Sequence, residues 1–196
     1  MKIVLATRNK KKVEEIRRVL QDDSIELLTL ADFPNCPEVI EDGDSFVANA
    51  EKKAIEVARY TSCHALADDS GLVIDALNGA PGIYSARYAG EGATDKANLD
   101  KVLAQLAALG NNVRTARFQC VISLASPAGE TESYNGTIEG HISITPQGNN
   151  GFGYDPIFIP QGHNITFAQM DGEQKDTMSH RGRALQAFSN GFKPEK

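Results

Sequence analysis

The chain has few cysteines, no excess of basic residues and no long apolar run. Its three cysteines are widely spaced among 196 residues, and no two of them form a Cys-x-x-Cys pair. A disulfide framework or a cysteine zinc site is therefore not indicated, and the pattern suits a reducing compartment. The formal net charge of −6 argues against a protein that coats nucleic acid, because that task needs an excess of Lys and Arg.

Several familiar ligand motifs are also missing. The Gly-x-x-x-x-Gly-Lys-Ser/Thr spacing of a P-loop is absent, and Gly90-Glu91-Gly92 lacks the strand and the further glycine of a dinucleotide fingerprint. No two of the four histidines have the spacing of zinc ligands. The apolar start, Met1 to Thr7, is one strand long and is followed by basic residues, the reverse of a secretory signal. Since no segment reaches the length of a membrane span, we expect a soluble cytoplasmic protein with neither a membrane nor a nucleic acid as partner.

The spacing of apolar residues predicts an α/β fold. Short runs of β-forming residues alternate with runs at helical spacing, and a hairpin and a final helix follow. The expected strands cover 3–6, 25–30, 64–68, 72–77, 117–124, the segment that ends at 138, 142–144 and 157–159. The expected helices follow Asn9, run from Ser45 to about Tyr60 and from Thr94 to Gly110, and begin at Ser179. This order favours a mixed sheet flanked by helices, with 1–196 as a single domain that has room for two lobes around a cleft.

A basic loop joins the first expected strand to the first expected helix. It offers a hydroxyl, a side-chain amide and three lysines at a predicted helix N-terminus. Backbone N–H groups and the helix dipole favour an anion at such a place. The loop is therefore a candidate phosphate site, although a solvated basic patch would have the same composition. Its residues are Thr7, Arg8, Asn9, Lys10, Lys11 and Lys12.

Two adjacent carboxylates, Asp68 and Asp69, stand at the end of an apolar run. Neighbouring strand residues point to opposite faces, so we expect one side chain to face the site and the other to support it. Close carboxylates repel unless a cation or a proton intervenes, which suits a Mg²⁺ ligand or a general base. A polar turn around Ser70 would explain the same residues without chemistry. Glu41 belongs to a second acidic cluster, which matters only if the fold brings it to Asp69.

Two segments of the C-terminal part suit a flat ligand with polar edges. Phe152-Gly153-Tyr154-Asp155 combines aromatic faces with a carboxylate, and Ser179-His180-Arg181 offers hydrogen-bond donors at the start of an expected helix. A nucleobase needs rings on which to stack and fixed donors that recognise its edge. These segments therefore predict a site for the base of a nucleotide.

Several motifs occur in order along nearly the whole chain. They are Thr7-x-Asn9-x-x-Lys12, Phe46-x-x-Asn49 with Lys53, Asp68-Asp69-Ser70-Gly71-Leu72, Gly79-Ala80-Pro81-Gly82, Gly151-Phe152-Gly153-Tyr154-Asp155-Pro156 and Ser179-His180-Arg181. In type, order and spacing these independent motifs closely resemble those of the inosine triphosphate pyrophosphatase family, enzymes that remove non-standard purine nucleotides from the nucleotide pool. The resemblance implies an elongated mixed sheet flanked by helices, two lobes around a central substrate cleft, and a homodimer.

The same resemblance implies the reaction and its residues. The expected activity is Mg²⁺-dependent hydrolysis of ITP, dITP and XTP to the monophosphate and pyrophosphate. Asp69 would act as general base with Asp68 beside it, and Asp69 and Glu41 would hold Mg²⁺; Ile40 stands where many members carry a further carboxylate. The phosphate-binding residues would be Thr7, Asn9, Lys12 and Lys53, with Arg8, Lys10 and Lys11 of the same loop, and Ser70 would contact the substrate. The base-binding residues would be Phe152, Gly153, Tyr154, Asp155, Lys175, His180 and Arg181.

The residues leave other functions open. A Maf-like pyrophosphatase for other modified nucleotides would share the architecture and differ in the base pocket. A nucleotide sensor would bind without catalysis, but unpaired carboxylates beside a triphosphate are costly unless a metal is present. A phosphatase that releases orthophosphate would use similar residues with another phosphorus facing the base.

Overall fold

The computed structural model describes residues 1–110 and 113–192, which form a mixed sheet with strand order β2-β1-β3-β4-β5-β6. β1 pairs in parallel with both β2 and β3, whereas β5 and β6 pair antiparallel. The strands are β1 (Lys2–Leu5), β2 (Glu26–Thr29), β3 (His64–Ile74), β4 (Thr115–Ala125), β5 (Thr131–Ile142) and β6 (Phe158–Pro160). The α-helices are α1 (Lys10–Val19), α2 (Phe46–Thr61), α3 (Asp95–Ala108), α4 (Gly172–Met178) and α5 (His180–Gly191). The predicted α/β class with a mixed, helix-flanked sheet is confirmed.

The chain divides into two compact units, each with its own core. The first unit comprises Met1–Asp69, Cys120–Gly136 and Arg181–Lys196, and the second comprises Ser70–Gln119 and Thr137–His180. β3, β4 and β5 each contribute residues to both units. Among the helices of the described ranges, none has the length and apolar character needed to cross a membrane.

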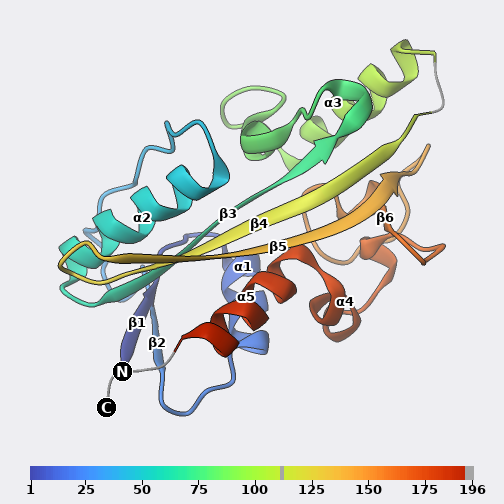
Figure 1. Cartoon of the computed structure of the whole chain (residues 1–196). Coiled ribbons are helices and arrows are strands. Elements are labelled where there is room, and N and C mark those ends of the chain that lie inside the picture. The colour runs from blue at the N-terminus through green and yellow to red at the C-terminus, as the bar shows by residue number, and fades with distance from the viewer. Residues whose placement is uncertain (111–112, 193–196) are drawn as a thin grey trace. The chain divides into compact units, whose positions relative to one another are not determined.

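In the first unit, the alternation of β1 determines what covers each face of the sheet. Ile3 and Leu5 belong to a buried cluster with residues of α1 and α5, whereas Val4 belongs to a cluster with Ala54 and other residues of α2. Figure 1 shows α2 on one side of these strands and α1 with α5 on the other. Because α1 and α2 cover opposite faces, the chain reverses its winding between β1 and β3. The carboxyl ends of two such strands form a topological switch point, where open α/β sheets bind ligands.

Three of the expected helices begin next to a residue whose side chain caps the helix. The Asn9 side chain accepts hydrogen bonds from the backbone N–H groups of Lys11 and Lys12, and Ser45 and Thr94 cap α2 and α3 in the same manner. Each such cap stabilises its helix by about 0.5–2 kcal/mol. Asn9 therefore fixes the basic loop at the point where β1 leads into α1.

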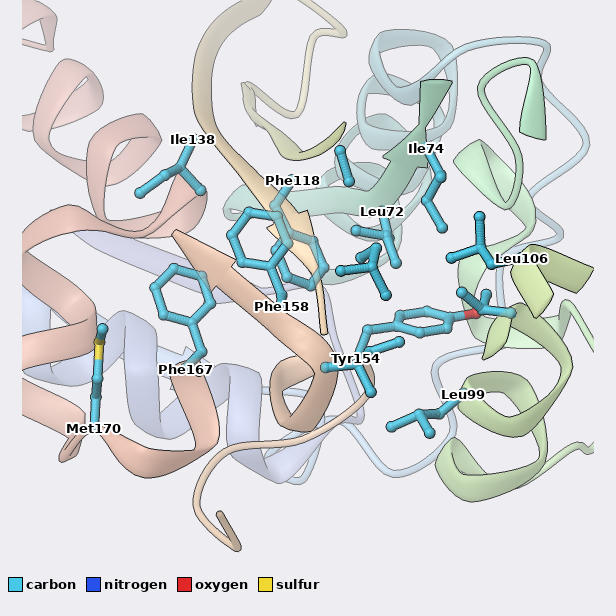
Figure 2. Close-up of a cluster of buried hydrophobic side chains, with 14 residues drawn as sticks. Leu72, Ile74, Leu99, Leu106, Phe118, Ile138, Tyr154, Phe158, Phe167 and Met170 are labelled. Atoms are coloured by element: carbon cyan, nitrogen blue, oxygen red, sulfur yellow. The ribbon is translucent and has the colours of Figure 1, made fainter. Parts of the chain in front are cut away.

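The core of the second unit combines aromatic rings with aliphatic side chains, as Figure 2 shows. Phe118 of β4 and Phe158 of β6 lie with ring centroids 4.6 Å apart, and Phe167 lies 5.2 Å from Phe158. Phe167 belongs to a short 3-10 helix, η4 (Phe167–Gln169). On the α3 side, Leu99 and Leu106 pack in the same cluster as Tyr154. This packing holds Tyr154, and with it the segment 152–155 that contains four of the predicted base-binding residues.

The observed elements differ from the expected ones at three places. β3 continues through Asp69-Ser70-Gly71 as one strand instead of being interrupted there, and it is an inner strand of the sheet, between β1 and β4. The expected strand at 142–144 is only the end of β5. α4 was not predicted, because Lys175 is its only buried residue and it therefore has no apolar stripe.

Candidate active site

Asp68 and Asp69 direct their carboxylates to different partners, as the alternation of β3 predicts. Asp68 accepts hydrogen bonds from Arg181 at the start of α5, whereas Asp69 accepts one from Asn49 of α2. Both side chains are buried. They follow Leu66, which pairs with Leu5 of β1, so they lie in the middle of β3, just beyond the carboxyl end of β1 and beside the switch point.

Asp68 is held in a buried network of charges. Its Oδ2 lies 2.8 Å from Arg181 Nη2 and 3.0 Å from Lys12 Nζ. Arg181 also donates to Glu15 of α1, and both of these side chains are buried. Burial opposes the ionisation of Asp68, but Lys12, Arg181 and Lys53 outweigh it and hold its pKa well below the usual range. Asp68 is therefore a permanent anion that orients two cations.

Asp69 has the opposite electrostatic character. Burial raises the pKa of Asp69 to about 6, and the nearby charge of Glu41 adds to the effect, against the opposing influence of Lys53 and Lys12. Its Oδ2 accepts a hydrogen bond from Asn49 Nδ2 at 3.1 Å. Two neighbouring carboxyl groups with pKa values pushed apart are a recurring arrangement of catalytic acids and bases.

Lys53 and Asn49 of α2 connect the acidic loop, residues 41–44, to Asp68 and Asp69. Lys53 Nζ lies 2.8 Å from Glu41 Oε1 and donates to the Asp68 carbonyl oxygen at 2.6 Å. Asn49 Oδ1 accepts the backbone N–H of Gly43 at 2.8 Å. A Cβ atom at Gly43 would lie 2.8 Å from that same oxygen, so only glycine permits this close approach. One turn of α2 thus fixes Glu41 beside Asp69.

The basic loop places its residues in different surroundings. Lys12 contacts Asp68, whereas the Arg8 guanidinium donates to the Cys36 carbonyl oxygen at 2.6 Å. The Thr7 hydroxyl accepts the backbone N–H of Asn9 at 3.2 Å. Arg8 and Lys10 line a pocket of about 400 Å³ along α1. Lys11 is exposed on the first turn of the helix. The predicted roles of these loop residues in phosphate binding stay predictions.

The acidic residues fit a Mg²⁺ ion that arrives with a substrate. Within 1–110 and 113–192, no group of three or more His, Cys, Asp or Glu side chains is arranged as a complete metal site. Mg²⁺ is, however, commonly bound by one or two carboxylates, with substrate phosphates and waters as further ligands. Asp69 and Glu41 supply such a pair. Burial, together with the charge of Glu41, raises the pKa of Asp69, and a divalent cation would favour the ionised carboxylates.

In the second unit, a buried ion pair supports the Phe152 ring. Asp155 Oδ2 accepts a hydrogen bond from Lys175 Nζ at 2.7 Å and another from the Phe152 backbone N–H at 2.9 Å. Lys175 Nζ also lies 5.0 Å from the centroid of the Phe152 ring. Gly151 has φ +71°, and a Cβ there would collide with the Asp155 carboxylate. Phe152 itself is partly buried and partly exposed.

Three further predicted base-binding residues, Tyr154, His180 and Arg181, are buried, whereas Gly153 is partly exposed. The ring of His180 stacks on Phe118 with the centroids 4.6 Å apart. Tyr154 is 4 % exposed, and its hydroxyl donates to the Ser85 carbonyl oxygen at 2.8 Å. Arg181 is 2 % exposed and binds the two carboxylates described above. Ser70 is partly exposed in β3, directly after Asp69. The proposed contacts of these residues with a base or a substrate stay predictions.

Glu15 and Asn49 were not among the predicted site residues. Glu15 is next to Ile16 in the apolar stripe of α1, and a charged residue at the edge of such a stripe is a signal of a buried ion pair. Asn49 precedes Lys53 by four residues, so the two share one face of α2. In each case the sequence predicts on which face of its helix the residue lies. It does not predict the partner, Arg181 for Glu15 and Asp69 for Asn49, because the partner is distant in the chain.

The first unit thus combines a candidate general base, a pair of carboxylates for a divalent cation, the buried Lys53 and the partly buried Lys12. Such a set can activate water and neutralise phosphate oxygens. The second unit combines a half-exposed aromatic ring with a buried ion pair, and such a set can stack on a planar base.

Known proteins with similar sequences and structures were found for almost the whole chain. Two dITP/XTP pyrophosphatases are similar in sequence: that of Desulfotalea psychrophila is 52 % identical over 93 % of this chain and 81 % of its own, and that of Shouchella clausii is 50 % identical over 95 % and 93 %. A HAM1 protein from Coxiella burnetii is similar in structure, with a TM-score of 0.90, 44 % identity and coverage of 97 % of both chains. A Staphylococcus aureus Ham1 protein superimposes with a TM-score of 0.86, 41 % identity and coverage of 98 % of this chain and all of its own.

The family model described as "Ham1 family" matches residues 3–191. This range contains Glu41, Asp68 and Asp69, which together form the acidic cluster, and residues 151–155, which form the aromatic turn. The chain therefore belongs to the Ham1 family.

Proposed function

We propose that the protein hydrolyses the non-standard purine nucleoside triphosphates ITP, dITP and XTP to the nucleoside monophosphate and pyrophosphate, and so removes them from the nucleotide pool. The observation that carries the proposal is the contrast between two neighbouring carboxylates: Asp68 is neutralised by cations, and Asp69 is held near Glu41 with a raised pKa. The names of the relatives, dITP/XTP pyrophosphatase, support this substrate class.

The acidic cluster accounts for the chemical step. Asp69 accepts a proton from a water molecule, whose oxygen forms a bond to the α-phosphorus while the bond from that phosphorus to the bridging oxygen breaks. The electron pair of the broken bond leaves with pyrophosphate. Lys12 and Lys53 stabilise the negative charge on the phosphates, and Asp68 keeps Lys12 in place.

The proposed cofactor is Mg²⁺, held by Asp69 and Glu41. When bound, Mg²⁺ supplies neutralisation of the charge on the triphosphate. Lys53, which lies 2.8 Å from Glu41, keeps that carboxylate in position. Only two protein carboxylates are needed, because the substrate supplies further oxygen ligands.

The aromatic turn accounts for binding of the purine. The exposed part of Phe152 stacks on the base, a contact worth about 1–3 kcal/mol that does not distinguish among purines. Asp155 binds the Phe152 backbone N–H, and the Lys175 ammonium lies over the Phe152 ring. Hypoxanthine and xanthine have a keto oxygen where adenine has an amino group, so a fixed donor at this position selects the former by about 1–3 kcal/mol. His180 and Arg181 are the proposed donors.

A product analysis tests the proposal. The full-length protein is incubated with Mg²⁺ and ITP, XTP, dITP, GTP or ATP, and the products are separated by ion-exchange chromatography. Monophosphate and pyrophosphate from the first three substrates, with much slower turnover of ATP, are expected. Release of orthophosphate would identify a phosphatase, and binding without any product would identify a sensor; either result would contradict the proposal. Asp69→Asn is the inactive control.

We also propose that the protein acts in the cytoplasm as a homodimer. The free cysteines Cys36, Cys63 and Cys120 are compatible with a reducing compartment. The homodimer is carried over from the resemblance to the inosine triphosphate pyrophosphatase family. Light scattering after size-exclusion chromatography tests the assembly, and a monomer mass at micromolar concentration would exclude the dimer.

A further inference from the structure

Two consecutive residues of the aromatic turn, which contains Phe152, form hydrogen bonds with other elements of the second unit. The backbone N–H of Gly153 donates to Asp95 Oδ2 at 2.8 Å, and the Tyr154 hydroxyl donates to the Ser85 carbonyl oxygen at 2.8 Å. Asp95 is the first residue of α3, and Ser85 belongs to a 3-10 helix, η2 (Gly82–Arg87). Both acceptors are therefore on elements distant in sequence from the turn.

These two elements form one scaffold. Asn98 of α3 is buried, and its side chain donates to the Ala86 carbonyl oxygen at 3.0 Å and accepts the Ala89 backbone N–H at 2.7 Å. The Ser85 hydroxyl accepts the Leu72 backbone N–H at 2.9 Å and donates to the Gly82 carbonyl oxygen at 2.7 Å. α3 is thereby joined to η2, and η2 to the sheet.

The two contacts with this scaffold differ in character. Tyr154 is buried among aliphatic side chains, toward Leu99 and Leu106 in Figure 2, and burial raises its pKa, so the hydroxyl keeps its proton. The Asp95 contact is exposed and joins a charged acceptor to a backbone donor next to Phe152. Gly153 has φ +61°, a left-handed conformation that reverses the chain directly after the stacking residue.

We propose that Asp95 is a positioning residue for purine binding: it holds the Gly153 peptide and so fixes the orientation of the Phe152 ring. This inference rests on the proposed function of Phe152 as the surface on which the base stacks. A ring held in its binding orientation loses less conformational entropy when the base arrives. Asp95 therefore affects the affinity for substrate and not the chemical step.

Three substitutions separate this role from a general effect on the helix. Asp95→Ala removes the acceptor, whereas Asp95→Asn keeps an acceptor oxygen without the charge. Asp95→Ser is tolerated at the start of a helix but is too short to reach Gly153, so it tests the contact again if the alanine variant is unstable. Asp100→Ala is the matched control, because Asp100 lies on the same helix and pairs with Lys96 on its surface.

Steady-state kinetics with ITP give the first readout. Asp95→Ala is expected to raise KM about tenfold, the effect of one lost hydrogen bond to a charged group, with kcat nearly unchanged, as for an interaction equally strong in the ground and transition states. Asp95→Asn is expected to restore most of the affinity, and Asp100→Ala to resemble the wild type. A KM for Asp95→Ala equal to that of Asp100→Ala, or a loss confined to kcat, would overturn the proposal.

A fluorescence measurement gives a second readout that needs no turnover. The chain contains no tryptophan, so Phe152→Trp introduces a single reporter on the turn. In this background, Asp95→Ala is expected to increase quenching by acrylamide and to lower the anisotropy of the reporter, and Asp95→Asn to do neither. Unchanged quenching in Asp95→Ala would exclude the positioning role even if ITP is hydrolysed. A protein that hydrolyses none of the triphosphates but shows increased quenching would refute the proposed function and leave the structural contact established.

Discussion

Asp68 and Asp69 are adjacent in β3, yet Asp68 binds Arg181 at 2.8 Å and Asp69 binds Asn49 at 3.1 Å, on helices that cover different faces of the sheet. The alternation of the strand separates their environments. Three cations hold Asp68 ionised, whereas burial and Glu41 raise the pKa of Asp69 to about 6. Two residues of identical chemistry are thus suited to different tasks, one to orient cations and the other to accept a proton.

Replacement of Asp69 by asparagine is expected to abolish turnover. The variant keeps the shape of the side chain but cannot accept a proton from water, and loss of a general base lowers rates by about 10²–10⁴-fold. Pyrophosphate release measures turnover, and calorimetric titration with ITP measures binding, which is expected to persist. Asp44→Asn, in the exposed part of the acidic loop, is the control. Pyrophosphate release at the wild-type rate by Asp69→Asn would remove this residue from the mechanism.

Replacement of Glu41 by glutamine is expected to weaken the use of Mg²⁺. Glu41 is one of the two proposed ligands, and even residues that only support a metal ligand change affinity by about 10–100-fold when mutated. The Mg²⁺ concentration for half-maximal activity is therefore expected to rise at least about tenfold, with activity recovered at high Mg²⁺. A titration that coincides with that of Asp44→Asn would show that Glu41 is not a ligand.

Replacement of Arg181 by alanine is expected to destabilise the protein. The guanidinium binds Asp68 and Glu15, and all three groups are buried. Removal of one partner from a buried ion pair costs about 3–5 kcal/mol, because the remaining charges are left uncompensated. Urea denaturation measures the free energy of unfolding, and Arg183→Ala, an exposed arginine of the same helix, is the control. A difference below 1 kcal/mol between the two variants, as for a surface ion pair, would contradict the buried network.

The same variant also tests recognition of the base. If Arg181 recognises the keto group, the ratio of kcat/KM for ITP to that for ATP falls in Arg181→Ala, measured at a temperature where the variant is folded. An unchanged ratio would leave Arg181 with the single task of holding Asp68.

Replacement of Asp75 by asparagine is expected to reduce stability in a pH-dependent way. Asp75 accepts hydrogen bonds from Thr115 at 2.6 Å and Arg117 at 2.9 Å, and these contacts lower its pKa. A carboxyl group with a lower pKa in the folded state stabilises the fold above its unfolded pKa, and this contribution is lost as the pH falls through the folded pKa.

The effect of Asp75→Asn is therefore expected at pH 7 and not in strong acid. Because the group is on the surface, the loss of unfolding free energy at pH 7 is expected to be below about 1 kcal/mol. Urea denaturation between pH 7 and pH 3 measures it, with Asp23→Asn as an exposed control. A difference from the wild type that persists unchanged at pH 3 would show that the charge of Asp75 is not its cause.

The sequence was sufficient for the parts of the fold that depend on local chemistry. Helices begin at Asn9, Ser45 and Thr94 as predicted, and each of these residues caps its helix, because a cap involves residues only two or three positions apart. The apolar alternation predicted the hairpin of β4 and β5, and the period of β3 predicted that its two aspartates would separate. The expectation that Asp69-Ser70-Gly71 would interrupt the strand was wrong: β3 runs through this segment as an inner strand of the sheet, although Ser and Gly locally favour turns.

By itself the sequence determined the family, the order of most strands and helices, and which residue types could handle a phosphate and a base, since these follow from short-range pattern and motif. Only the tertiary structure decided the partner of each charge: that Arg181 and Lys12 neutralise Asp68, that Glu41 approaches Asp69, and that Asp95 holds Gly153. Charges act through space, and 113 residues separate Asp68 from Arg181 along the chain. A pattern of a few neighbouring residues cannot show which distant residues become partners, so the chemistry of each carboxylate depends on how the chain folds.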